Sequence, residues 1–132
     1  MILFAVTLAA ILLSIALGVS EIAYKENTFG TSDKDTDNAF FAADSGAEQL
    51  LYNDKKGNYD PSLVPTGGLY TWPNVIITGL GNDGTSCAIA NITKDSTGLA
   101  TIISDGYNIG DSSCNSTSLN RVQREIKTTY AY

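Results

Sequence analysis

The chain has no histidine, and its 132 residues include 14 acidic but only 8 basic side chains. Without histidine, a Ser-His-Asp or Cys-His catalytic site is excluded, and the commonest zinc and copper ligand is missing. The formal net charge of −6 disfavours binding to nucleic acid, because an acidic surface repels the phosphate backbone. We therefore expect no enzymatic activity, no cofactor, no metal and no direct nucleic-acid partner.

Charge is also missing from the first twenty residues, because no acidic or basic side chain precedes Glu21. Twenty helical residues span about 30 Å, which matches the hydrocarbon core of a bilayer. The segment has no proline, so one helix can satisfy its backbone hydrogen bonds inside lipid. The rest of the chain is polar and rich in Gly, Ser, Thr, Asn and Asp. The sequence thus predicts one oily segment and one part that faces water.

Three interpretations of the oily segment compete. A secretory signal peptide begins with basic residues, and a plain membrane anchor carries basic residues on its cytoplasmic flank. Neither pattern is present, because no Lys or Arg precedes the apolar run. The third interpretation is that a short basic leader has been removed, which makes Met1 a processed N-terminus.

The oily segment is also suited to association with copies of itself. Small residues are interspersed in it, at Ala5, Ala9, Ala10, Ser14, Ala16 and Gly18. Small side chains let helices approach closely, and a head-to-tail contact that does not close builds an open helical fibre. Burying about twenty apolar residues would contribute more than about 35 kcal/mol before entropy costs. The predicted fibre core comprises Met1, Ile2, Leu3, Phe4, Ala5, Val6, Leu8, Ile11, Leu12, Leu13, Ile15 and Leu17.

The helical pattern continues beyond the oily segment. Phe40, Ala43, Ala47 and Leu50 or Leu51 recur at steps of three and four. This spacing predicts one apolar stripe on a helix, which packs on the rest of the chain.

Glycines mark two places where this helix is expected to be weak. Gly lowers helix stability by about 1 kcal/mol relative to Ala. We expect a kink or a melted turn at residues 28–32, around Gly30, with Gly18 as a second candidate.

Asp33, Asp35, Asp37 and Asp44 have spacings like those of a calcium-binding loop. However, Asn38 stands where that loop requires glycine, and Asp44 stands where it requires a bidentate glutamate. The alternative is an exposed acidic helix start, because carboxylates favour the positive end of the helix dipole. We favour the second interpretation.

From residue 54 onward, turn signals and β-branched residues predict a head of short strands. The expected strands cover residues 69–80, with an interruption at Pro73, and residues 86–92, 98–104 and 121–130. About four antiparallel strands packed on the helix would bury both apolar faces. The predicted fold class is α+β, with a helical region at 1–53, hydrophobic over 1–20, and a β-rich head at 54–132. Trp72 and the tyrosines are expected to lie in the core or at interfaces.

The two cysteines, Cys87 and Cys114, both lie in the head. Without histidine nearby they favour a disulfide in an oxidising, extracytoplasmic setting, although two unpaired buried thiols are the alternative. Closing a loop of about 28 residues would stabilise the head by roughly 3–4 kcal/mol. The bond would join the third-from-last strand to the loop before the last strand.

Two asparagines, Asn91 and Asn115, stand in the N-x-Ser/Thr pattern of glycosylation acceptors. Their use depends on the organism, so they are candidate glycosylation sites and nothing more.

The segment ALGVSEIAYKE, followed by AFFAADSGAEQLLY, resembles the N-terminal region of type IV pilins of the PilX-like minor-pilin kind. The similarity covers roughly residues 1–52. It implies that a peptidase removes a leader and that the new N-terminus is methylated. It also implies a helical homopolymer with identical subunits, assembled by membrane machinery together with other pilins. The subunit would occupy the inner membrane before assembly and the extracellular filament afterwards.

One residue departs from this resemblance. Most major pilins carry a glutamate where this chain has Ala5, and that glutamate pairs with the α-amino group of a neighbour. Minor pilins often lack the glutamate. The expected function is therefore a filament subunit for adhesion, motility or surface contact, and the alternative is a minor pilin or pseudopilin of a secretion or DNA-uptake machine.

Overall fold

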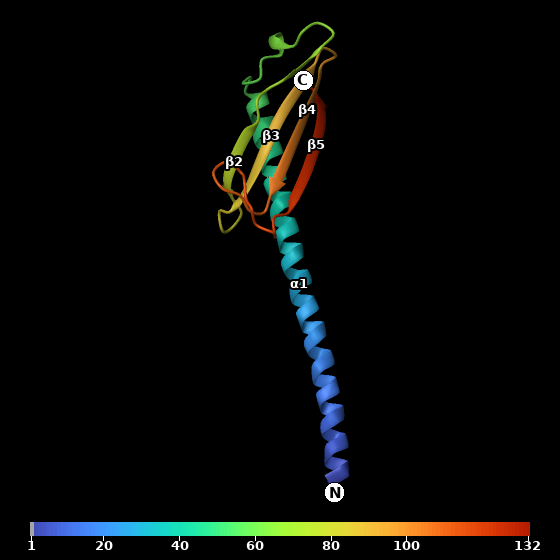
Figure 1. Ribbon diagram of the computed structural model, residues 1–132. Coiled ribbons are helices and arrows are strands. Elements are labelled where there is room, and N and C mark those ends of the chain that lie inside the picture. The colour runs from blue at the N-terminus through green and yellow to red at the C-terminus, as the bar shows by residue number, and fades with distance from the viewer. Residues whose placement is uncertain (1) are drawn as a thin grey trace. The chain divides into compact units, whose positions relative to one another are not determined.

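The computed structural model describes residues 2–132 and has an α+β fold (Figure 1). One helix, α1 (Ile2–Lys55), is followed by a short 3-10 helix, η1 (Pro61–Leu63). Five strands follow: β1 (Leu69–Thr71), β2 (Val75–Leu80), β3 (Ser86–Asp95), β4 (Leu99–Tyr107) and β5 (Gln123–Ala131). Met1 lies outside the described residues, so its expected roles as processed N-terminus and as part of a fibre core stay predictions.

Helix α1 is continuous through residues 28–32 and through Gly18, so the expected melted turn at Gly30 and the expected unwinding at Gly18 are wrong. One glycine costs a helix only about 1 kcal/mol, which the surrounding turns can absorb. Next to Gly30, the hydroxyls of Thr28 and Thr31 donate to the carbonyls of Tyr24 and Asn27, each at 3.0 Å. These bonds satisfy both threonine hydroxyls within the helix.

The chain divides into two compact units, one ending at Lys34 and the other spanning Asp35–Tyr132. The second unit contains the last part of α1 as well as all five strands. The sequence predicts a boundary between residues 53 and 54, where the helix ends. The structural boundary lies after Lys34, because the last part of α1 packs on the sheet.

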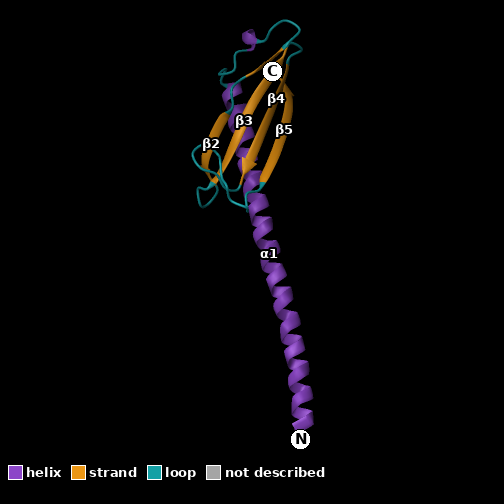
Figure 2. Ribbon diagram, viewed as in Figure 1, coloured by secondary structure: helices purple, strands orange, loops and turns teal. Residues whose placement is uncertain are grey.

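The sheet is entirely antiparallel, with β3 and β4 at its centre and β5 beside β4 (Figure 2). Both β1 and β2 pair with β3, at residues 93–95 and 86–90 respectively. Since β4 occupies the other side of β3, β1 and β2 share one edge of the sheet. Pro73 separates them, because proline cannot donate to the ladder. The predicted interruption at Pro73 is therefore confirmed. The sheet has five strands, where the sequence predicts about four.

The last part of α1 packs on one face of this sheet through small residues (Figure 1). The buried helix residues are Ala39, Ala42, Ala43, Gly46, Ala47 and Leu50. A Cβ atom at Gly46 would overlap Ser104 Oγ, and one at Gly106 would overlap the carbonyl oxygen of Ala39. The helix and the sheet thus approach so closely that only hydrogen fits at these two positions.

The predicted apolar stripe is right at Ala43, Ala47 and Leu50 and wrong at Phe40. Phe40 is 49% exposed, and Phe41 beside it is 62% exposed. The close approach of helix and sheet leaves no room for a benzyl group, so the stripe selects small side chains. Toward the end of α1 the gap widens, and Leu50 joins a core that also contains Tyr59, Ala90, Ile92, Ala100 and Ile102.

Candidate functional site

The first candidate site is the apolar helix surface, which we define as the side chains of Ile2–Val19. Every described residue up to Lys34 is exposed within this chain. Ile2 and Leu3 are each 82% exposed, and Leu8, the most covered large apolar residue there, is still 44% exposed. Among the described residues, α1 is the one helix that is long and apolar enough to cross a membrane.

Polar groups within the apolar helix surface are satisfied inside the helix. Thr7 Oγ1 donates to the carbonyl of Phe4, and Ser14 Oγ donates to the carbonyl of Ala10, each at 2.9 Å. Such back-bonding lets hydroxyls enter an apolar environment without an external partner. The surface therefore carries no polar group that would resist burial in lipid or against another helix.

The predicted disulfide between Cys87 and Cys114 is present, and both residues are fully buried. It joins β3 to the loop between β4 and β5, as the sequence predicts. Asp111 supports this loop, because its Oδ1 accepts from the backbone N–H groups of Ser113 and Asn115 at 2.8 and 2.9 Å. These hydrogen bonds lower the pKa of Asp111, the one from Asn115 contributing most.

The two candidate glycosylation residues have different surroundings. Asn115 is exposed in the loop next to the disulfide, whereas Asn91 is half-buried within β3. Between them, Asn115 has the more accessible side chain, and the use of either residue stays a prediction.

The calcium-binding alternative fails on local structure. Asp33, Asp35, Asp37 and Asp44 all lie within α1, in helical conformation rather than in a loop. A calcium loop wraps its ligands around one point, which a straight helix cannot do. The preferred interpretation, an acidic helix start, is also wrong, because α1 begins at Ile2.

The second candidate site is a buried ion pair that the sequence did not lead us to expect. Lys94 Nζ lies 2.5 Å from Asp54 Oδ1, and the two side chains are only 3% and 4% exposed. Lys94 also donates to the carbonyl of Tyr59 at 2.9 Å. Its ammonium lies 4.4 Å from the ring centroid of Tyr132 and 5.8 Å from that of Trp72. The aromatic rings thus exclude water and face the cation with their electron-rich surfaces.

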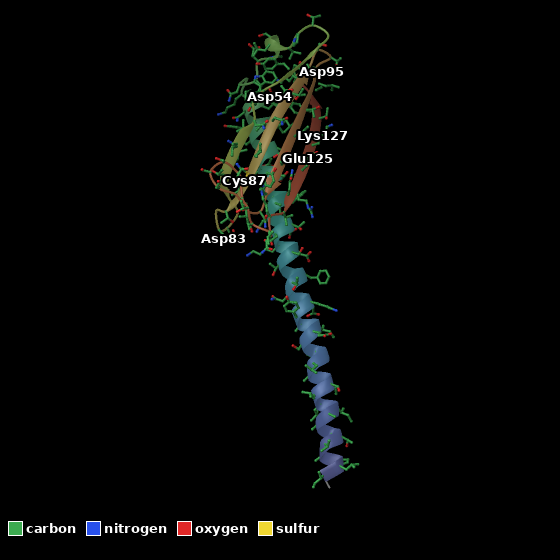
Figure 3. All side chains as sticks on the ribbon, in the orientation of Figure 1. Asp54, Asp83, Cys87, Asp95, Glu125 and Lys127 are labelled. Atoms are coloured by element: carbon green, nitrogen blue, oxygen red, sulfur yellow. A yellow bond between two sulfur atoms is a disulfide. The ribbon has the colours of Figure 1, made fainter. Side chains whose placement is uncertain are left out.

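Tyr130 completes this group, which we call the Lys94 cluster: Asp54, Tyr59, Trp72, Lys94, Tyr130 and Tyr132. The hydroxyl of Tyr130 donates to Asp54 Oδ2 at 2.6 Å. Burial raises the pKa of Tyr130, and the hydrogen bond to Asp54 raises it further, so the hydroxyl keeps its proton. Figure 3 places Asp54 toward the same end of the sheet as Asp95, and Cys87 toward the opposite end.

A sequence signal for the Lys94 cluster existed. In β3, Ala88, Ala90, Ile92 and Lys94 alternate on the face that α1 covers. A lysine at an inward position requires a partner, because burying an unpaired charge is costly. Asp54 could not be chosen as that partner, since the register between α1 and β3 is not visible in the sequence.

Comparisons with protein-family models, with curated proteins and with solved structures found no match to this chain. The structure has an α+β fold: the side chains of residues 2–19 form an uncovered apolar surface, and within the second unit the last part of α1 packs on an antiparallel sheet.

Proposed function

We propose that this chain is the structural subunit of an extracellular type IV pilus-like filament, in which the apolar helix surfaces of identical subunits bundle together. The subunit would reside in the inner membrane before assembly, and other pilins and membrane machinery would build the fibre. Adhesion, motility or surface contact would be the purpose of such a fibre.

The observation that carries this proposal is the uncovered apolar helix surface. A continuous helical face from Ile2 to Val19, with no charged residue, cannot remain in water. Lipid covers it in a membrane, and copies of the same helix cover it in a fibre. The small residues Ala5, Ala9 and Ala10 favour burial against copies of the same helix, because they allow backbones to approach closely.

The rest of the chain supports a subunit that leaves the cytoplasm. A buried disulfide persists in an oxidising compartment and stabilises a small exposed head. The resemblance of residues 1–52 to type IV pilins points the same way, and it remains a resemblance.

The test compares substitutions of the full chain in cells that carry the assembly machinery. Leu12→Lys places a charge in the apolar helix surface, at a cost of about 3 kcal/mol in an apolar environment. Leu119→Lys is the matched control, because Leu119 is fully exposed in the head. We expect sheared extracellular material to show fibres by negative-stain microscopy for the wild type and Leu119→Lys, but not for Leu12→Lys.

A second variant separates helix packing from membrane insertion. Ala9→Leu keeps the segment apolar, so the amount in the membrane should not change, whereas the larger side chain should reduce fibre yield. Wild-type chain that remains in the membrane as monomers would refute the filament proposal.

The alternative is a minor pilin or pseudopilin of a secretion or DNA-uptake machine. Ala5 favours this alternative, because it leaves the α-amino group of a neighbour without the acidic partner that major pilins provide. Substituting Ala5→Glu should then lengthen or increase the fibres of a minor subunit, whereas a major subunit that assembles without this acid should gain little.

A further inference from the structure

The Lys94 cluster brings a primary amine and a carboxyl group together in a site closed to water. Lys94 Nζ and Asp54 Oδ1 are 2.5 Å apart, and both side chains are more than nine-tenths buried. Asp54 comes from the last turn of α1, and Lys94 comes from the far end of β3. The two residues are therefore positioned by different elements and held together by the fold itself.

We propose that Lys94 and Asp54 react within the folded chain to form an isopeptide bond between Nζ and Cγ. The ammonium first transfers a proton to the carboxylate, which gives a neutral amine and a carboxylic acid. The amine nitrogen then attacks Cγ, and the new C–N bond forms as the carbonyl electrons move onto Oδ2. A proton passes from the nitrogen to Oδ1, the C–Oδ1 bond breaks, and Oδ1 leaves as water. The products are one amide and one water molecule, with no oxidant or reductant.

The surroundings favour each part of this reaction. In a site shielded from water, two charges lose their solvation, and their conversion into a neutral amide removes that cost. Groups held in contact react as if one were present at about 10⁵–10⁸ M. The Tyr130 hydroxyl, 2.6 Å from Oδ2, donates to the oxygen on which negative charge develops.

The hydrogen bonds of the cluster also fit the product. An amide at this position has one N–H, and Lys94 Nζ already donates to the carbonyl of Tyr59 at 2.9 Å. It has one carbonyl oxygen, and Oδ2 already accepts from Tyr130. Oδ1, the atom that departs, forms the ion pair with Lys94 but accepts no hydrogen bond, so its loss leaves no group of the cluster without a hydrogen bond. The reaction thus replaces two buried charges by a neutral, satisfied amide.

Other charged groups around Lys94 do not replace Asp54 as the reacting partner. Asp60 lies near enough to interact electrostatically with Lys94, but it is exposed and its Oδ1 accepts from the backbone N–H of Ser62 at 2.8 Å. Among residues 2–132, Asp54 provides the carboxylate within ion-pair distance of Lys94. The bond is independent of filament assembly and can be tested whether or not fibres form.

Mass spectrometry of the full chain, isolated from cells that express it and then denatured and reduced, tests the proposal. After trypsin digestion, we expect a branched peptide in which the fragment containing Asp54 is joined to the fragment containing Lys94. Its mass should be lower than the sum of the two fragments by one water molecule, and cleavage after Lys94 should be absent. Separate linear fragments, with normal cleavage after Lys94, would overturn the proposal.

Two lysine variants provide the controls. Lys94→Arg keeps a positive charge but lacks a nucleophilic amine, so the branched peptide should disappear. Lys127→Arg changes an exposed lysine of β5 in the same way and should leave the branched peptide intact. A branched peptide that survives Lys94→Arg would refute the assignment of the amine.

Tyr130→Phe tests the hydroxyl donor. Removing one donor to a developing oxyanion slows a reaction by about 10²–10³-fold. In freshly synthesised chain, the fraction of branched peptide should therefore rise more slowly with time than in the wild type. If Tyr130 has only a structural role, Tyr130→Phe should change stability but not the rate at which the branched peptide forms. An unchanged rate would therefore show that Tyr130 takes no part in the reaction.

Discussion

The two parts of α1 place apolar side chains in opposite surroundings. From Ile2 to Val19 the large apolar side chains are exposed, whereas from Asp35 to Lys55 the buried residues are mostly alanine and glycine, and the two phenylalanines face outward. The difference shows that apolar character alone does not determine burial. The distance to the neighbouring surface does, because a close approach admits only small side chains.

The largest expected effect concerns the disulfide, which belongs to the second unit only. Replacing Cys87 and Cys114 together by Ser should lower the free energy of unfolding by about 3–4 kcal/mol, because the unfolded chain regains loop entropy. The measurement is urea unfolding of the full chain in detergent, followed by the fluorescence of Trp72, the single tryptophan. An unchanged midpoint would show that the loop is held by other contacts.

A second experiment compares two apolar residues of the same helix. Leu50→Ala should cost about 3 kcal/mol, because Leu50 is fully buried and its removal leaves a cavity. Phe41→Ala should change the free energy of unfolding by less than about 0.5 kcal/mol, because the ring is 62% exposed. Equal losses in the two variants, measured by urea unfolding, would contradict the orientation of α1 on the sheet.

Two glycines sharpen the comparison further. Gly106→Ala should destabilise the second unit by about 2 kcal/mol, because its Cβ would meet the backbone of Ala39 and Ala43. Gly30→Ala is the matched control, since a Cβ there meets nothing within 4 Å. It should leave the Trp72 transition unchanged and raise helix content slightly. Comparable thermal midpoints for the two variants would argue against the close approach.

The smallest expected effect is on acid stability. The pKa of Asp95 is lowered, mainly by the hydrogen bond from the Thr97 hydroxyl and then by the backbone N–H of Leu99. Because the folded pKa lies below the unfolded one, this contribution is present above about pH 4 and is lost as the pH falls further.

In Asp95→Asn, the free energy of unfolding should therefore fall less steeply between about pH 4 and pH 2 than in the wild type. The measurement is thermal unfolding of the full chain at a series of pH values. Asp83→Asn, in the exposed turn before β3 (Figure 3), is the control and should leave that slope as it is. An identical slope for the wild type and Asp95→Asn would remove Asp95 as a contributor.

Much of the fold could be predicted from patterns that are local in the sequence. The uncharged run that ends before Glu21, the break at Pro73 and the spacing of Ala43, Ala47 and Leu50 all act through neighbouring residues. The exposure of Phe40 could not be predicted, because it depends on how near the sheet approaches the helix. The Lys94 cluster was missed for the same reason, since its members come from separate elements.

Pro73 has a further consequence for the proposed filament, in which subunits would lie close together. It divides the strand residues on one side of β3 into two short pieces, so that side offers no long row of free N–H and C=O groups. On the opposite side, β5 carries Arg124, Glu125 and Lys127. Charges of this kind discourage a foreign strand from adding to the ladder. Neither edge of the sheet is a good template for added strands, so in the proposed filament neighbouring heads could lie side by side without their sheets joining.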